Sequence, residues 1–294
     1  MNINNYYVYK DVKVGFGNFN LPPVLIGTMF YQGQSIIERN NTQNFNKEKA
    51  KKRIKQQQDL SKQYNIPNLI EISADNPKAM IKYLEFYLDN FKPPFVLGGS
   101  FESRASGVAY LIERGVKPEE FIYNTISSLK NKKECDLIKN NNIMSVVILI
   151  LGSSNMTSTQ RFNYITGKIQ PDKSNLIEGL KNLGVKMIWI DGGVVDLESL
   201  AHILEAQQLI STSLKLPVGT APNLFLFKYS SPKLNLKFHT RYRRASIMFI
   251  VSWFSNFIFY GAIEDAKECF ASAYQSIKFK NTLKAHNVKL LDGF

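Results

Sequence analysis

Amide, carboxylate and hydroxyl side chains recur in this sequence directly after apolar runs of strand length. They are Tyr31, Gln32, Glu71, Ser100, Asn124, Ser153, Asn155, Asp191, Asn223 and Glu264, with Gly98 and Gly99 beside Ser100. The set contains no histidine, cysteine or lysine. The asparagine amide offers hydrogen-bond donors and an acceptor, and the aspartate carboxylate offers acceptors, so a site built from them would suit a neutral, nitrogen-rich heterocycle.

Several other reaction types lack the residues that they need. The histidines His202, His239 and His286 show neither an HxH nor an HExxH spacing, so we assign no metal site. A Schiff-base aldolase requires a lysine at a strand end, and a serine hydrolase carries a GxSxG motif. Neither feature is present, which leaves the asparagine and aspartate side chains as the candidates for chemistry.

The elements that must position these side chains are short apolar runs separated by segments of helix length. The runs cover residues 24–30, 68–73, 94–98, 121–124, 145–152, 187–191, 216–220 and 256–260. They are continuously apolar, which is typical of parallel strands covered on both faces. Between them, Asn76 before Pro77 predicts the start of one helix and Asp196 the start of another. Gly115 predicts a helix end.

Eight strands alternating with helices in a chain of 294 residues predict an α/β fold, the (β/α)8 TIM barrel, whose usual size is about 250 residues. The competing fold is an open, doubly wound sheet, which would usually carry a GxGxxG motif after an early strand; none is present. We expect residues 1–20 to form a hairpin that closes the barrel floor and residues 21–294 to form one domain. The active site of such a barrel lies at the carboxyl ends of the strands.

The chain is basic, with 37 Lys and Arg residues against 24 Asp and Glu residues and a net charge of +13. Such a surplus favours acidic ligands, acidic proteins, anionic membranes or nucleic acid. Much of it lies in residues 47–55 and 130–133, and the first run has the spacing of a solvated helix face. Aromatic residues are not interleaved with these runs as base stacking requires, so we expect no nucleic-acid binding.

Three features bear on the compartment. Cys135 and Cys269 show no disulfide spacing and are expected to be reduced, as in a cytoplasmic protein. Residues 1–14 lack the pattern of a secretory signal. Residues 245–263 carry no charge and are long enough to span a membrane, but serine, asparagine and glycine interrupt them. We predict a buried helix followed by a buried strand there.

Seven stretches follow one another in register with the predicted barrel elements. They are VLIGTMFYQGQ at 24–34, residues 46–64, PFVLGGSFESRASGVAY at 94–110, YNTI at 123–126, IDGGVVD at 190–196, PVGTAPN at 217–223 and YGAIEDA at 260–266. Their order and spacing resemble the H subunit of tetrahydromethanopterin S-methyltransferase. The resemblance implies a barrel methyltransferase that moves a methyl group from a methylated pterin, methyltetrahydromethanopterin or methyltetrahydrofolate, to the Co(I) of a corrinoid held by a partner protein.

The resemblance also implies roles for individual residues. Asn124 matches the strand-four asparagine of pterin-binding methyltransferases, and Asp191 matches the strand-six aspartate; both would bind the amide and amino edge of the pterin. Asn223 matches the asparagine after strand seven and would donate to the ring nitrogen that loses the methyl group, where positive charge is needed. Ser100 and Asn155 are further expected substrate contacts. Turn or cap roles are the alternatives for Asn124, Asp191 and Asn223.

The chain departs from the family at Gly98, where the family usually has an aspartate that contacts the pterin. Three interpretations stay open. Ser100 or Glu102 takes the place of the aspartate, or the donor is another N- or O-methyl compound, or the barrel has lost activity and serves as a binding partner. A phosphate-ligand site near Gly219 and Gly261 is a further alternative.

The family's chemistry implies partners. We expect a corrinoid (cobalamin) protein, other subunits of a methyltransferase complex and a homo-oligomeric state. The chain would be cytoplasmic, or peripheral to a membrane through those subunits. The polar segment 153–174 is predicted to be a long loop on the active face, where the corrinoid protein would dock.

Overall fold

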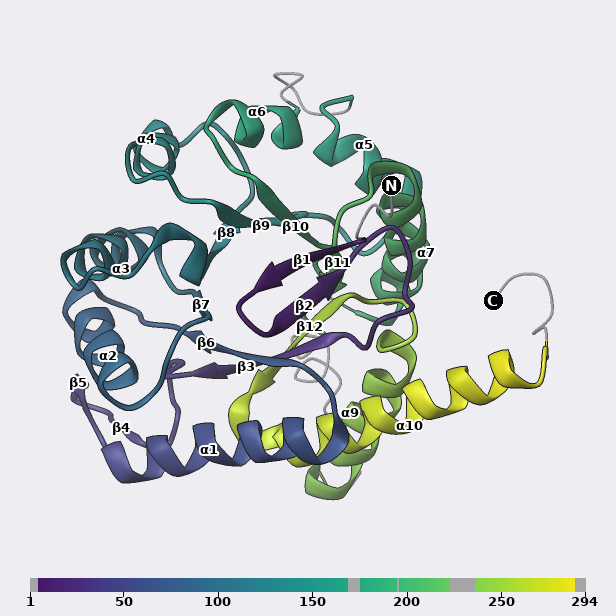
Figure 1. Cartoon of the computed structure of the whole chain (residues 1–294), viewed down its shortest axis with the longest axis horizontal. Helices are drawn as coiled ribbons and strands as arrows, with labels where there is room; N and C mark the ends of the chain where they lie inside the picture. Colours follow the sequence, from purple (N-terminus) through teal and green to yellow (C-terminus); the bar gives the residue numbers. More distant parts are fainter. Residues whose placement is uncertain (1–4, 169–174, 195, 223–235, 289–294) are drawn as a thin grey trace.

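Parallel strands close a barrel in the middle of the molecule (Figure 1). The structure, a computed structural model, describes residues 5–168, 175–194, 196–222 and 236–288. In ring order the eight strands are β3 (Val24–Met29), β6 (Asn68–Ile72), β7 (Phe95–Leu97), β8 (Phe121–Ile126), β9 (Ser145–Leu149), β10 (Met187–Asp191), β11 (Val218–Thr220) and β12 (Phe257–Ala262). The predicted TIM barrel is confirmed, and the open doubly wound sheet is excluded because the ring is closed.

Helices cover the outside of the ring (Figure 1). They are α1 (Lys47–Tyr64), α2 (Pro77–Asn90), α3 (Phe101–Glu113), α4 (Lys132–Asn140), α5 (Ser158–Ile165), α6 (Leu176–Asn182), α7 (Leu197–Leu214), α9 (Leu236–Val251) and α10 (Ala266–Ala285), with 3-10 turns η1 (Pro118–Glu120) and η2 (Ile263–Asp265). Asn76 caps α2 and Asp196 caps α7, each accepting a backbone N–H bond from three residues further on. Both predicted helix starts are therefore confirmed.

The N-terminal hairpin, β1 (Tyr6–Tyr9) and β2 (Val12–Gly15), lies across the barrel (Figure 1). The buried Tyr9 hydroxyl lies 2.8 Å from Oγ of Ser145 and accepts a hydrogen bond of 2.9 Å from Nε1 of Trp189. Since Ser145 is the first residue of β9, this contact is at the amino-terminal end of the barrel. The hairpin closes the barrel floor, as predicted.

Replacing Tyr9 by phenylalanine is expected to lower the free energy of unfolding by about 1–3 kcal/mol, because the buried Trp189 N–H and Ser145 hydroxyl lose their partner. Denaturant unfolding measures this change. The control is Tyr6→Phe on the same hairpin, where the ring is only half-buried and the expected change is within about 0.5 kcal/mol. Equal effects of the two substitutions would contradict a specific role of the Tyr9 hydroxyl.

The segment 153–174, predicted to be one long loop, contains helix α5 instead. Thr157 begins this helix with a capping box. Arg161 on the helix is fully buried, and its guanidinium donates to the backbone carbonyls of Met156 and Gly192. The loop prediction is wrong for this part because a two-turn helix shows little apolar periodicity; residues 169–174 lie outside the described residues.

The uncharged stretch 245–263 forms the second half of α9, a turn and strand β12. Met248 and Val251 are buried on the helix, and Phe257 and Ile258 are buried on the strand. The prediction of a buried helix followed by a buried strand is confirmed. In the part of the chain that the structure describes, every helix is too short or too polar to cross a membrane.

Candidate functional site

Alternating side chains place a polar layer above an apolar layer inside the barrel. The apolar layer, which packs on the hairpin, contains Ile26, Leu69, Val96, Ile122, Val147, Trp189 and Phe259. Two residues after members of that layer come Thr28, Glu71, Gly98, Asn124 and Asp191. These five positions face the same interior because side chains alternate along a strand. They lie at the carboxyl ends of their strands, where a barrel builds its active site.

Glu71 links three strands across this mouth of the barrel. The Thr28 hydroxyl donates to Oε2 of Glu71 at 2.6 Å, and the Asn124 side-chain amide donates to Oε1 at 2.7 Å. The Glu71 side chain is buried, and burial raises the pKa of its carboxyl, while the two hydrogen bonds lower it. The donors thus hold the carboxylate in one orientation at the mouth.

Asp191 is the last residue of β10 and is also buried. Burial raises its pKa to about 7; the Gly193 N–H, which donates to Oδ1 at 2.9 Å, lowers the pKa, and the charge of Glu71 raises it. Asp191 follows Trp189 by two residues, as Glu71 follows Leu69, so both carboxyl groups face the interior of the barrel at the same mouth. Near neutral pH the Asp191 carboxyl is divided between its protonated and ionised forms.

Two predicted site residues, Asn124 and Asp191, therefore lie at the same mouth of the barrel. The Asn124 amide donates across the mouth to Glu71. Asp191 also takes the turn role that its sequence context offers, through the bond to Gly193. Asn223, predicted as the donor to the ring nitrogen, lies outside the described residues.

Ser100 and Asn155 lie on the same side of the barrel, after β7 and β9. Ser100 is exposed and caps α3, its Oγ accepting from the Ser103 N–H at 3.2 Å. Asn155 is exposed, and its Oδ1 accepts from the Ser153 hydroxyl at 2.7 Å. Their roles as substrate contacts stay predictions.

Gly98 leaves the space that the Glu71 carboxylate fills. A Cβ atom at residue 98 would overlap Oε1 of Glu71. Ser100 and Glu102, the residues that the sequence offers as substitutes for the missing aspartate, are exposed at the start of α3. Glu71 was not assigned to the site from the sequence, although one signal was present: it is the single charged residue in the run NLIEI, two residues after Leu69.

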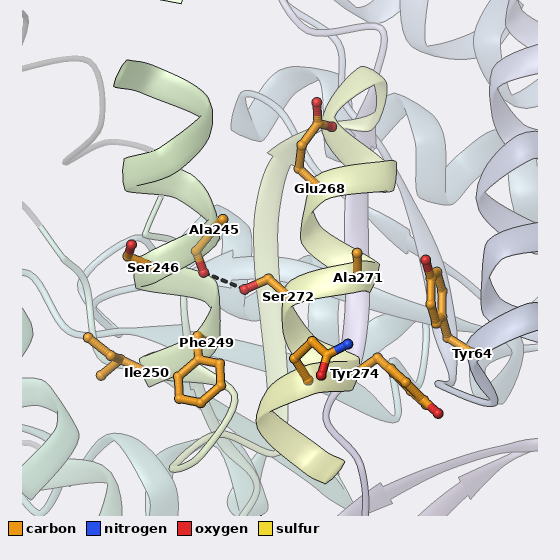
Figure 2. Close-up of a pocket in the computed structure, with 10 residues that line it drawn as sticks. Tyr64, Ala245, Ser246, Phe249, Ile250, Glu268, Ala271, Ser272 and Tyr274 are labelled. Carbon is orange, nitrogen blue, oxygen red and sulfur yellow. Dashed lines mark hydrogen bonds between the residues drawn. The ribbon is translucent and has the colours of Figure 1, made fainter. Parts of the chain in front are cut away.

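A separate groove lies on the outer surface of the barrel, between α9 and α10 (Figure 2). Its volume is about 690 Å³, and Tyr64 of α1 completes its lining. The Ser272 hydroxyl of α10 donates to the Ala245 carbonyl of α9 beside it (Figure 2). Of the predicted site residues that the structure describes, none lines this groove, so the candidate site remains the barrel mouth.

The fold and the site define a TIM-barrel protein with carboxylates and an amide gathered at the carboxyl ends of its strands. The family model described as the tetrahydromethanopterin S-methyltransferase MtrH subunit matches residues 7–289. The chain belongs to this family of methyltransferase subunits, and the resemblance seen in the sequence is confirmed.

Curated relatives carry the same description. The H subunit of tetrahydromethanopterin S-methyltransferase from Methanothermobacter marburgensis is 34% identical over 138 residues, which cover 47% of this chain and 44% of that protein. The corresponding protein from Methanosarcina acetivorans, described in the same words, is 23% identical over 299 residues, which cover 98% of this chain and 94% of that protein. The matched region is thus less than half of the first relative and nearly all of the second.

Solved structures with the same fold include two dihydropteroate synthases. The Yersinia pestis DHPS, determined with a pterine-sulfa conjugate, matches with a TM-score of 0.62 and 12% identity, covering 94% of this chain and 99% of that one. The Xanthomonas albilineans dihydropteroate synthase matches with a TM-score of 0.59 and 10% identity, covering 97% of this chain and 99% of that one. At these identities the likeness shows the TIM-barrel fold.

Proposed function

We propose that this chain is a methyltransferase that moves a methyl group from N5 of a methylated pterin to the Co(I) of a corrinoid held by a partner protein. The observation that carries the proposal is the meeting of Asn124, Glu71 and Asp191 at the mouth of a barrel of this family. The names of the relatives favour methyltetrahydromethanopterin as the donor, with methyltetrahydrofolate as the other candidate. The Yersinia barrel was determined with a pterine-sulfa conjugate, which supports the proposal that a barrel of this fold binds a pterin.

The ring would be held by its polar edge. A pterin presents parallel N–H donors from its amide and amino groups, and the ionised Asp191 carboxylate would accept both. The Asn124 side chain offers a donor and an acceptor to the same edge. The apolar layer beneath, which includes Ile122 and Trp189, would exclude water from one side of the bound ring.

The reaction needs a donor at the ring nitrogen. A tertiary amine leaves poorly unless its nitrogen gains positive character, so a donor against N5 stabilises the transition state more than the ground state. We assign this role to Asn223, because it matches the asparagine that follows the seventh strand in pterin-binding methyltransferases. The partner's corrinoid would supply the Co(I) nucleophile, and the chain's own task would be to bind and orient the pterin and exclude water.

Pterin affinity is expected to fall as the pH drops below 7. In the free protein Asp191 has a pKa of about 7, and the N–H donors of a bound pterin favour its ionised form, so its pKa is lower in the complex. The pterin therefore binds preferentially to the protein in which Asp191 is ionised. Below the pKa of Asp191, the Kd of the pterin rises by up to about tenfold for each pH unit by which the pH is lowered. Calorimetric titration between about pH 6 and about pH 8.5 measures this change, and a constant Kd over that range would contradict it.

A titration with tetrahydromethanopterin and tetrahydrofolate tests the donor. Binding of either pterin supports the proposal, whereas a folded protein that binds neither rules it out and favours another N- or O-methyl compound, for which the missing side chain at Gly98 is the supporting observation. The phosphate-site alternative loses support at Gly219, because β12 packs so closely there that a Cβ would overlap the Phe257 carbonyl.

We also propose the partners that this reaction requires. They are a corrinoid-binding protein and other subunits of a methyltransferase complex, since the relatives are named as subunits. A homo-oligomeric state and a cytoplasmic location, peripheral to a membrane through the partner subunits, belong to the same proposal. Co-purification of the tagged protein with a corrinoid protein tests the proposed corrinoid partner.

A further inference from the structure

Glu71 is a buried carboxyl group to which the family resemblance assigns no role. Within the part of the chain that the structure describes, its side-chain oxygens accept one hydrogen bond each, and both donors, Thr28 and Asn124, are uncharged. The cation that lowers the pKa of Glu71 is Arg104. That guanidinium forms its ion pair with Glu134 at 2.6 Å, so it does not neutralise Glu71 directly.

A carboxylate in this position is costly unless further donors reach it. Taking a charge out of water without a paired cation is unfavourable. Each carboxylate oxygen can accept a second hydrogen bond, so among the described residues Glu71 has unused acceptor capacity at the mouth. A ligand that carries N–H groups into the mouth would use this capacity and offset the cost of burial.

The neighbouring glycine shows that the position of this carboxylate is specified by the sequence. A Cβ at Gly98 would meet Glu71 Oε1, and it would force the carboxylate away from Thr28 and Asn124. Backbone conformation does not account for this glycine, because the positive φ, 97°, belongs to Gly99 and not to Gly98. Space for Glu71 accounts for it.

We propose that Glu71 is a substrate-binding residue and a specificity determinant, whose carboxylate accepts hydrogen bonds from ring N–H groups of the pterin while Asp191 accepts from others. This inference rests on the proposed function. In this chain β6 would thus supply, through Glu71, the carboxylate that Gly98 does not supply from the end of β7.

Two carboxylates suit the donors of a tetrahydropterin. The ring carries N–H groups at N3, at the 2-amino group and at N8, more than one carboxylate can accept in a bidentate contact. A ligand without such donors would leave the remaining acceptor positions of Glu71 and Asp191 buried without a donor, and the site would reject it. The pair therefore selects for a reduced, donor-rich ring.

The test is a calorimetric titration of tetrahydromethanopterin into four proteins at about pH 8, above the pKa of Asp191. Wild type is expected to bind, and Glu71→Gln, which keeps the size of the side chain, is expected to bind about 10- to 100-fold more weakly. Gly98→Ala keeps the carboxylate but displaces it, so its affinity should also fall. Glu113→Gln, at the exposed end of α3, is the matched control and should bind as wild type does.

Two further measurements test the contacts that Glu71 makes with Gly98 and Asp191. In a Glu71→Ala background, Gly98→Ala should cause no additional loss, because the group with which it clashes is gone. In Glu71→Gln, the pH at which affinity falls should move downward, since the charge that raises the pKa of Asp191 has been removed. An unchanged pH would contradict the electrostatic coupling of Glu71 to Asp191.

The outcomes distinguish this inference from the function on which it rests. Wild-type affinity in both Glu71→Gln and Gly98→Ala would overturn the role of Glu71 and leave the proposed function standing. Failure of folded wild type to bind the pterin would overturn both. Thermal unfolding checks that each variant is folded, and if Glu71→Gln is not, Gly98→Ala gives the answer.

Discussion

Replacing Asp191 by asparagine is expected to lower kcat/KM for methyl transfer by about 100- to 1000-fold. The substitution keeps the size of the side chain but removes the charge that would accept from two pterin N–H groups. It also places an NH₂ group where the ligand itself presents donors. Steady-state methylation of free cob(I)alamin, with methyltetrahydromethanopterin as donor, measures the effect.

The matched control is Asp136→Asn, the same substitution at an exposed position of α4. We expect wild-type kcat/KM for this variant. The Asp191 variant should also lose the fall in pterin affinity below pH 7, because the titrating group is absent. Full activity of Asp191→Asn would contradict the role assigned to Asp191.

Replacing Asn223 by alanine is expected to lower kcat by about 100- to 1000-fold with little change in the Kd of the pterin. A donor that acts on N5 only as the methyl group leaves contributes to the transition state and not to ground-state binding. Single-turnover methyl transfer gives the rate, and a calorimetric titration of the same protein gives the Kd.

Asn140→Ala, at the exposed end of α4, is the control for this second variant and should leave both quantities unchanged. A Kd that rises while kcat stays the same would show instead that Asn223 binds the ground state. Wild-type values for both quantities would remove Asn223 from the site.

The barrel could be predicted from the sequence because its signals are local. Each strand is a continuous apolar run bounded by polar residues, and parallel strands covered on both faces require that pattern. Asn76 and Asp196 mark helix starts through bonds made within a single turn. Such signals depend little on the rest of the fold.

Two elements could not be predicted because contacts distant in the sequence stabilise them. The hairpin β4 (Ile37–Glu38) and β5 (Asn41–Phe45) packs through Phe45 against Phe30 and against Tyr83 of α2. Helix α5 depends on the buried Arg161, which donates to the Gly192 carbonyl after β10. Neither segment shows a clear period of its own.

The site was predictable only in part, for a related reason. Asn124 and Asp191 follow from their strand-end positions and from the family resemblance. The position of Glu71 in the mouth depends on the space above Gly98, which belongs to another strand. A residue whose environment is supplied by a neighbouring strand becomes identifiable once the two strands are placed side by side.

The most direct test of the account is methyl transfer by the purified chain. The protein is mixed with methyltetrahydromethanopterin and cob(I)alamin, and the conversion of Co(I) to methylcobalamin is followed by its absorbance. We expect methylation that depends on the wild-type protein and is lost in Asp191→Asn. A folded wild-type protein that binds the pterin and yet never methylates the cobalamin, alone or with its corrinoid protein, would contradict it.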